Sequence, residues 1–276
     1  MRAVRYAGAA GEPRIGRLED DHVVDAGPAG AIGFDASPEA WATVAAAAGA
    51  SFEIDAVRLL HPVVPRKLIG IGLNYRDHAA ESELAIPEVP VLFAKFSSSL
   101  TGPGETIVIP REETRPDYEG EVAVVIGRRT YRADAAAARA AVGGLTAVND
   151  VSGRRAQLET PLRQFTLGKS FDTFAPMGPC VAGADDTDLE SIGLRTTVSG
   201  EVLQDSSTEN LIFSIVELIV YCSSGMTLEP GDVIATGTPG GVGDSRTPPR
   251  YLREGDVVEV SVDGVGTLRN PVALEP

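Results

Sequence analysis

The stretch DYEGEVAVVIG, residues 117–127, decides the fold. Its first four residues are polar and turn-like, whereas residues 122–126 form an apolar, mostly β-branched run that ends at Gly127. This pattern predicts a buried strand entered from a loop. Side chains alternate between the two faces of a strand, so Glu119 and Glu121 point the same way, with Cα atoms about 6.5 Å apart. The two carboxylates therefore share one small volume.

Two acids beside a buried strand cannot both stay ionised without cost. One must take up a proton, or a cation must lie between them, unless they sit on a solvated strand face as most such pairs do. Later residues favour the cation. Asp150 follows the apolar residues 144–148 and precedes a polar break, which predicts a third carboxylate at a strand end. Lys169 supplies a cationic side chain, and the glycine-rich residues 235–243, ATGTPGGVG, supply backbone donors.

Six motifs then follow one another in a specific order and spacing. They are NYRDHAAE (74–81), FAKFSSSLTGPGE (93–105), DYEGEVAVVIG (117–127), NDVS (149–152), GKSFDTFAPMGP (168–179) and IATGTPGGVG (234–243). With them the chain resembles the fumarylacetoacetate hydrolase family over residues 67–271. The resemblance implies a β-rich α+β fold, with a rolled, barrel-like mixed sheet behind a small variable N-terminal domain. It also implies a homodimer.

The composition allows one large domain, or a large domain with a small one, because the chain has 276 residues and is 43% hydrophobic. Residues 1–65 are predicted to form the small N-terminal domain. Short apolar runs alternate there with turn residues, and an alanine-rich helix is predicted over residues 38–48. Residues 66–276 are predicted to form the catalytic domain. His22 and His61 are expected to be surface or packing residues.

The charge indicates the kind of partner. A net charge of −15 argues against nucleic acid or an anionic membrane, because both need a basic surface. No apolar run reaches the ~20 residues of a spanning helix, and the N-terminus lacks the apolar core of a signal peptide. We therefore expect a cytoplasmic protein whose partner is a small molecule, which the resemblance makes a keto-acid substrate.

Several common catalytic motifs do not fit the sequence. The GIG of residues 70–72 lacks the third glycine of a dinucleotide fingerprint, since Tyr75 stands at that position. Residues 235–243 lack the end of a P-loop, and no GxSxG elbow supports a nucleophilic triad. Cys180 and Cys222 have no CxxC spacing, so they indicate packing rather than a disulfide or a zinc site. Metal-assisted chemistry remains.

The predicted metal ligands are three carboxylates, Glu119, Glu121 and Asp150. A site of oxygen ligands alone suits Mg²⁺ or Mn²⁺, and Ca²⁺ is also compatible. If each carboxylate gives one oxygen, an octahedral ion keeps about three positions for water or substrate. Two of them suit an α-keto acid or a 1,3-dicarbonyl, and both the ion and Lys169 would stabilise an enolate.

A short helix is predicted after residues 67–73, with Asn74 near its N-cap. His78 and Glu81 would then share one face, at i and i+3. A carboxylate beside an imidazole fixes its tautomer and raises its basicity, as in a general base that activates water, although such a pair on an exposed helix is common by chance. The family's matching positions form a His–Glu dyad on a segment that orders over the substrate. The resemblance thus assigns His78 and Glu81 to catalysis, with Lys169.

The resemblance also implies the substrate-binding residues Arg154, Gln157 and Thr238. Arg154 matches the family's arginine. The next position departs from the pattern, because Arg155 stands where relatives commonly carry an acid. The polarity around Asp150 is therefore open: Arg155 either pairs with another carboxylate or favours a substrate with a second carboxylate.

Two further helices are predicted in the body. Residues 135–141 are alanine-rich and are assigned only packing. Ser206 and Glu209 have the spacing of a capping box and precede LIFSIVELIVYC, residues 211–222. Because this segment is apolar nearly all round, we expect it in the core or at a subunit interface.

Three functions are consistent with these residues. The first is a Mg²⁺-dependent hydrolase that cleaves a C–C bond of an acylpyruvate or related β-diketo acid, with water activated by His78 and Glu81. The second is decarboxylation of an oxaloacetate-type acid, or ketonisation and isomerisation in aromatic catabolism, which also pass through an enolate. The third is a metal-stabilised binding protein, which the dyad and Lys169 argue against. We expect the hydrolase.

Overall fold

The computed structural model describes residues 1–159, 161–185 and 187–276. Its main sheet has the order β4-β3-β2-β1-β14-β12-β11-β17-β6-β7, with β5 paired to β1 and β8 to β14; a second sheet has the order β16-β15-β18-β19-β9, and β10 pairs with β13. The strands are β1 (Arg2–Ala7), β2 (Pro13–Glu19), β3 (His22–Pro28), β4 (Ser51–Glu53), β5 (Leu59–Leu60), β6 (Leu68–Gly72), β7 (Val91–Lys95), β8 (Leu100–Thr101), β9 (Ile107–Ile109), β10 (Pro116–Asp117), β11 (Gly120–Ile126), β12 (Val142–Asn149), β13 (Ser152–Gly153), β14 (Ala175–Ala182), β15 (Gly193–Val198), β16 (Glu201–Ser207), β17 (Val233–Ala235), β18 (Val257–Val262) and β19 (Gly266–Leu274).

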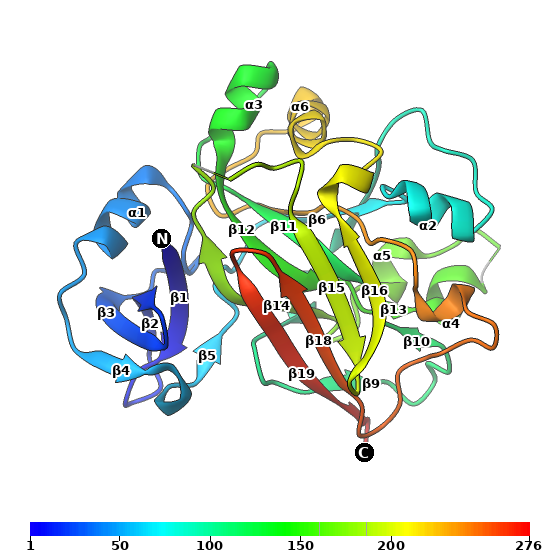
Figure 1. The fold of residues 1–276 in the computed structure, drawn as a ribbon, viewed down its shortest axis with the longest axis horizontal. Helices are drawn as coiled ribbons and strands as arrows, with labels where there is room; N and C mark the ends of the chain where they lie inside the picture. The colour runs from blue at the N-terminus through cyan, green and yellow to red at the C-terminus, as the bar shows by residue number, and fades with distance from the viewer. Residues whose placement is uncertain (160, 186) are drawn as a thin grey trace.

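The helices lie around the rim of these sheets. They are α1 (Pro38–Ala45), α2 (Arg76–Glu81), α3 (Ala135–Ala141), α4 (Arg154–Leu158), α5 (Phe165–Gly168) and α6 (Ile215–Gly225), with 3₁₀ turns η1 (Ile54–Ala56), η2 (Ser97–Ser99), η3 (Thr208–Asn210) and η4 (Gly243–Ser245). In Figure 1, α1 lies with β1 to β5 on the left, whereas α2, α4 and α5 gather on the right and α3 and α6 lie along the top.

β11 holds the centre of the main sheet, and all 7 of its residues are buried. It pairs antiparallel with β12 on one side and with β17 on the other. A strand covered on both faces needs no polar alternation, which explains its continuous apolar run. Gly120 of β11 lies opposite Asn149 of β12. This register brings the acids on either side of Gly120 next to Asp150, which follows β12.

The second sheet closes over β11 and shares its core. Val122 and Val124 of β11 belong to the same buried cluster as Val258 and Val260 of β18. The α+β, β-rich fold class is therefore confirmed. The roll is not a closed barrel, because within the residues described here the main sheet ends at β4 and at β7.

The N-terminal segment continues the main sheet. β1 pairs with β14, and the Trp41 indole donates a 2.8 Å hydrogen bond to the Gly143 carbonyl. Phe34 and Val125, from the two sides of this junction, share one buried cluster. Whether residues 1–65 form a separate domain stays a prediction.

Two helices differ little from expectation. α3 has the predicted bounds, Ala135–Ala141. α1 ends at Ala45 and not at residue 48, because the chain turns back towards β3. There the Gly49 amide donates to the Asp25 carbonyl, and the Asp25 amide donates to the Ala50 carbonyl.

The predicted capping box at Ser206 and Glu209 is wrong. Ser206 pairs with Leu194 inside the sheet, and Glu209 lies in η3. The capping box is formed one motif later, where Ser214 and Glu217 bond reciprocally at the start of α6. Both segments have the Ser-x-x-Glu spacing. The first does not start a helix, because Ser206 belongs to β16 and pairs with β15.

α6 packs on the body through one face. Its buried side chains include Ile215, Leu218 and Cys222, whereas the Tyr221 side chain is exposed. In the predicted homodimer the exposed face of α6 would contact the second subunit. The homodimer stays a prediction. None of the helices within the described ranges is long and apolar enough to cross a bilayer.

Candidate active site

The three predicted ligand carboxylates meet at one point. Glu119 lies just before β11, Glu121 lies within it, and Asp150 follows β12. Each offers one oxygen, and these oxygens lie within 4.8 Å of one another in a buried setting. The structure therefore brings together the residues that the i, i+2 spacing and the strand end predicted. Their role as ligands remains a proposal.

Glu119 is held between two cations. Its Oε2 lies 2.7 Å from Lys169 Nζ, and its Oε1 lies 2.6 Å from Arg154 Nη2. Although burial acts in the opposite direction, these two cations lower the pKa of Glu119 to about 2. Glu119 is thus a carboxylate at neutral pH.

Asp150 also contacts two cations, and the sequence reasoning missed one of them. Lys169 Nζ lies 2.7 Å from Oδ2, and Lys95 Nζ lies 2.6 Å from Oδ1. The Lys95 side chain is fully buried, and this burial lowers its pKa. A signal was available, because Lys95 follows the apolar Phe93 and Ala94 of the FAKFSSS motif, and a lysine that such residues bury needs a carboxylate partner.

Glu121 is different, because no cationic side chain among the described residues contacts it. Its Oε2 accepts a 2.9 Å hydrogen bond from the Gly237 amide of the glycine-rich loop. Burial, together with the charges of Asp150 and Glu119, raises the pKa of Glu121 well above the ordinary glutamate range.

The cluster has more carboxyl groups than cationic side chains, and this difference fits a cation site. The buried carboxylates of the cluster are Asp117, Glu119, Glu121 and Asp150, and its buried cations are Lys95, Arg154 and Lys169. Among the described residues the cluster therefore has one more carboxyl group than cations, and the carboxyl group without a cationic contact is Glu121. Each carboxylate oxygen has two lone pairs, so an oxygen that accepts from lysine or arginine can still bind a metal. The donor set is made of hard oxygens, which suits Mg²⁺, Mn²⁺ or Ca²⁺.

Lys169 bridges the carboxylates at the floor of the site. Its ammonium donates to Glu119, to Asp150 and, at 2.9 Å, to Ser152 Oγ. Burial opposes the charge, but Asp150 and Glu119 raise the pKa of Lys169. Lys169 therefore stays a cation, and it cannot serve as a base near neutral pH. A substrate oxygen would have to replace one of its three partners, and the neutral Ser152 hydroxyl costs least to exchange.

His78 and Glu81 lie on one face of α2, as predicted. His78 Nδ1 is 3.3 Å from Glu81 Oε1, and Glu81 Oε2 accepts a 2.7 Å hydrogen bond from the Gly241 amide. Burial opposes ionisation of Glu81, but the contacts with His78 and Gly241 lower its pKa. The pair is thus held against the glycine-rich loop.

Asn74 does not cap this helix. The N-cap position is Tyr75, whose side chain makes no capping hydrogen bond. The Asn74 amide instead donates to the carbonyls of Phe213 and Thr236, and its Oδ1 accepts from the Phe213 amide. Asn74 was expected at the start of the helix because of its type, but its side chain joins two distant loops.

A cavity of about 590 Å³ contains the catalytic and substrate-binding residues predicted from the sequence. Its lining includes His78, Glu81, Glu119, Arg154, Gln157, Lys169 and Thr238. The Thr238 hydroxyl donates to the Gly120 carbonyl and accepts from the amide of Gln204. The hydroxyl therefore holds the loop on β11.

Arg155, inside α4, and Arg163, in the segment after α4, are both exposed but differ in their contacts. Arg155 is exposed, donates to the Glu112 carbonyl and lies 3.9 Å from Glu159, and it is outside the set of described residues that line the cavity. Arg155 was expected either to pair with another carboxylate or to favour a substrate with a second carboxylate. In the structure it lies near the carboxylate of Glu159. Arg163 does line the cavity, and it makes no ion pair with a described residue. The sequence reasoning missed it.

The remaining histidines make surface or packing contacts, and both cysteines are packing residues. His61 Nδ1 contacts the Val63 carbonyl at 2.8 Å, and His22 pairs with Glu53 at the surface. Cys180 and Cys222 are free and buried.

Fold and site together define a class of enzymes. The family model for the C-terminal domain of fumarylacetoacetate hydrolase matches residues 67–273. The chain belongs to the fumarylacetoacetate hydrolase family.

The relatives carry several activities in their names. An oxaloacetate tautomerase of Bacillus subtilis is 46% identical over 220 residues, which is 77% of this chain and 72% of that protein. The structure of a 5-carboxymethyl-2-hydroxymuconate delta-isomerase from Mycobacterium smegmatis aligns with this one over 100% of both chains, with a TM-score of 0.83 and 35% sequence identity. The structure of a fumarylacetoacetate hydrolase from Exiguobacterium antarcticum also aligns over 100% of both chains, with a TM-score of 0.84 and 35% sequence identity.

Proposed function

We propose that this protein is an isomerase that interconverts the enol and keto forms of an oxaloacetate-type acid. The observation that carries the proposal is Arg163, an exposed arginine that lines the cavity without an ion-pair partner among the described residues. Oxaloacetate has a carboxylate at each end, whereas a simple acylpyruvate has one. The name of the Bacillus subtilis relative supports the same substrate class. The expected hydrolase is thus replaced as the first candidate by a reaction that takes its substrate class and its enol–keto conversion from the second function and leaves out the decarboxylation.

The substrate would lie between two cationic regions. Its keto oxygen and the adjacent carboxylate face Lys169 and Arg154 in this proposal, and the distal carboxylate faces Arg163. Arginine suits the distal end, because its guanidinium binds a carboxylate through two parallel hydrogen bonds.

The reaction moves one proton. In ketonisation the enol O–H bond breaks and a C–H bond forms at C3, so no atom is gained or lost. Histidine exchanges protons near neutral pH, and we assign His78 to deliver and remove the proton at C3. Glu81 fixes the imidazole, and Lys169, which keeps its proton, offsets the negative charge on the oxygen as the proton leaves.

Glu119, Glu121 and Asp150 would hold a divalent ion next to Lys169. When bound, such an ion supplies a Lewis acid that withdraws electron density from the keto oxygen. Mg²⁺ or Mn²⁺ is the proposed ion, and Ca²⁺ fits the same ligands.

Hydrolysis of an acylpyruvate is the second candidate. The cavity volume of about 590 Å³ leaves room for a substrate longer than a four-carbon acid. One of the similar structures is a fumarylacetoacetate hydrolase. In that reaction His78 would take a proton from water, and the same residues would line the site.

The test compares substrates and two arginine variants. With Mg²⁺ present, the protein should ketonise enol-oxaloacetate with a higher kcat/KM than it cleaves acetylpyruvate. Arg163→Gln should raise the KM for oxaloacetate by ~10-fold or more, the effect of one lost charged hydrogen bond. Arg155→Gln is the matched control and should leave KM unchanged. Equal effects of both variants, or faster acetylpyruvate cleavage by the wild type, would reject the proposal.

A further inference from the structure

We propose that Asp117 is a positioning residue that orients Arg154 and thereby keeps Glu119 available as a metal ligand. The inference rests on the metal site proposed above. Asp117 has an exposed fraction of 0%, and it is outside the set of described residues that line the cavity. Its influence must therefore pass through its neighbours.

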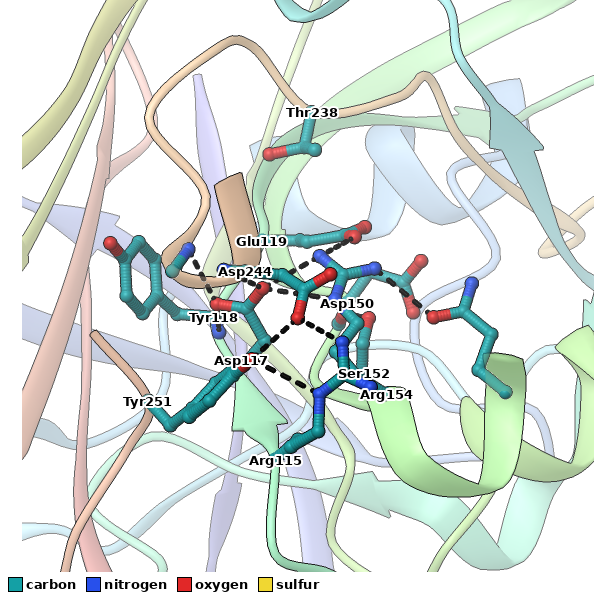
Figure 2. Close-up of polar contacts among 12 residues, drawn as sticks. Arg115, Asp117, Tyr118, Glu119, Asp150, Ser152, Arg154, Thr238, Asp244 and Tyr251 are labelled. Carbon is teal, nitrogen blue, oxygen red and sulfur yellow. Dashed lines mark hydrogen bonds and ion pairs between the residues drawn. The ribbon is translucent and has the colours of Figure 1, made fainter. Parts of the chain in front are cut away.

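The first neighbour is Arg154, which Asp117 contacts twice. Asp117 Oδ2 accepts from Arg154 Nε at 2.9 Å and lies 2.8 Å from Nη2. Because a guanidinium is planar and rigid, two contacts on one edge fix the whole group. Nη2 then lies 2.6 Å from Glu119 Oε1, and Nη1 donates to Gln157 at 3.1 Å. Figure 2 shows Asp117 and Glu119 on either side of this guanidinium.

The second neighbour is the far end of the glycine-rich loop. Asp117 Oδ1 accepts from the amides of Tyr118 and Gly243, at 2.9 and 2.7 Å, and Oδ2 accepts from the Asp244 amide at 3.0 Å. A Cβ atom on Gly243 would lie 2.5 Å from Asp117 Oδ1, so glycine permits this approach. Four hydrogen-bond donors therefore fix Asp117 itself, one of them Arg154 Nε, and Arg154 Nη2 adds a close charge contact. Arg154 and Asp244 both line the cavity, and Asp117 ties them together.

The guanidinium of Arg154 contacts two carboxylates, those of Asp117 and Glu119. A buried guanidinium without Asp117 would have Glu119 as its one close carboxylate among the described residues. It would turn towards Glu119 and use the oxygen lone pairs that a metal needs. Asp117 thus competes with Glu119 for Arg154, and this leaves lone pairs on the Glu119 oxygens free to bind a metal.

A double-mutant cycle on Mn²⁺ affinity tests this path without any substrate. The proteins are the wild type, Asp117→Asn, Arg154→Gln and the double variant. Asp117→Asn should raise the Kd for Mn²⁺ by ~10- to 100-fold, the usual effect of a residue that orients a ligand. In the Arg154→Gln background the same change should alter Kd by no more than about twofold.

Two comparisons keep the test decisive. If Asp117→Asn does not fold, Asp117→Glu takes its place in the cycle, because it keeps the charge but displaces the carboxylate from Arg154. Asp244→Asn removes one negative charge near the same cavity and should leave Kd within about threefold of the wild type. A further large loss in the double variant, or an equal loss in Asp244→Asn, would overturn the proposal. Failure of oxaloacetate turnover would leave it standing, whereas a wild type that binds no Mn²⁺ would overturn it together with the metal site.

Discussion

Replacing Glu121 by glutamine should make the metal-free protein more stable while it destroys metal binding. Glu121 is buried, and no cation among the described residues contacts it. Glutamine keeps the shape of the side chain and can still accept the hydrogen bond from the Gly237 amide. It removes a carboxyl group whose ionisation is opposed by burial and by the charges of Asp150 and Glu119.

The size of the effect follows from the separation of the carboxylates. Their ligand oxygens lie within 4.8 Å of one another, and two unit charges at about 5 Å repel by roughly 3 kcal/mol at an effective dielectric constant of about 20. Lys169 offsets part of this repulsion. We therefore expect a gain of ~1–3 kcal/mol in the free energy of unfolding, in the range found when buried charges are neutralised, or roughly 2–8 °C in Tm.

Thermal unfolding with and without Mn²⁺ measures both effects. Mn²⁺ at about 100 times Kd should stabilise the wild type by about 2.7 kcal/mol, and Glu121→Gln should show no such gain. Asp232→Asn is the control, because it neutralises a buried carboxylate that is paired with Lys67 at 2.7 Å, and it should lower Tm. The reasoning fails if Glu121→Gln lowers the Tm of the metal-free protein or keeps the Mn²⁺ gain.

Three further predictions concern other parts of the chain. His78→Ala should lower kcat for ketonisation by ~10²- to 10⁴-fold with little change in Mn²⁺ affinity, and a kcat within a few fold of the wild type would remove the residue from the mechanism. The Arg14 guanidinium lowers the pKa of Asp25 to about 2, so this carboxylate adds stability that is complete above the unfolded pKa of 3.8 and is lost as pH falls through about 2. Asp25→Asn should therefore lower Tm at pH 7, and the difference from the wild type should close as pH falls below about 2; a difference that does not change with pH would contradict the ion pair. Sedimentation should give twice the mass of the 28.8 kDa chain, and a fully active monomer would refute the dimer.

Much of the fold could be predicted because its signals are local. The apolar run of β11 and the alanine-rich α3 specify their own structure through pattern and propensity. The start of α6 could not be fixed in this way. Ser206 and Ser214 both begin a Ser-x-x-Glu pattern, and the hairpin pairing of Ser206 with Leu194 of β15, which the capping pattern does not report, decides between them.

The site was predictable where residues share a strand, and less so where contacts are long-range. Glu119 and Glu121 are two residues apart, so strand geometry alone brings them together. Lys95 meets Asp150 from 55 residues away, and Arg163 reaches the cavity from the segment after α4. No periodicity reports such contacts, because they depend on how the sheet rolls.

The rate of enol-to-keto conversion of oxaloacetate tests the central claim most directly. It is followed by the loss of enol absorbance, with Mg²⁺ present and acetylpyruvate cleavage measured in parallel. We predict that the wild type accelerates ketonisation, that oxaloacetate is recovered intact without release of CO₂, and that Arg163→Gln loses most of this rate at low substrate. If ketonisation proceeds at the uncatalysed rate while acetylpyruvate is cleaved, or CO₂ is the main product, the tautomerase assignment is wrong.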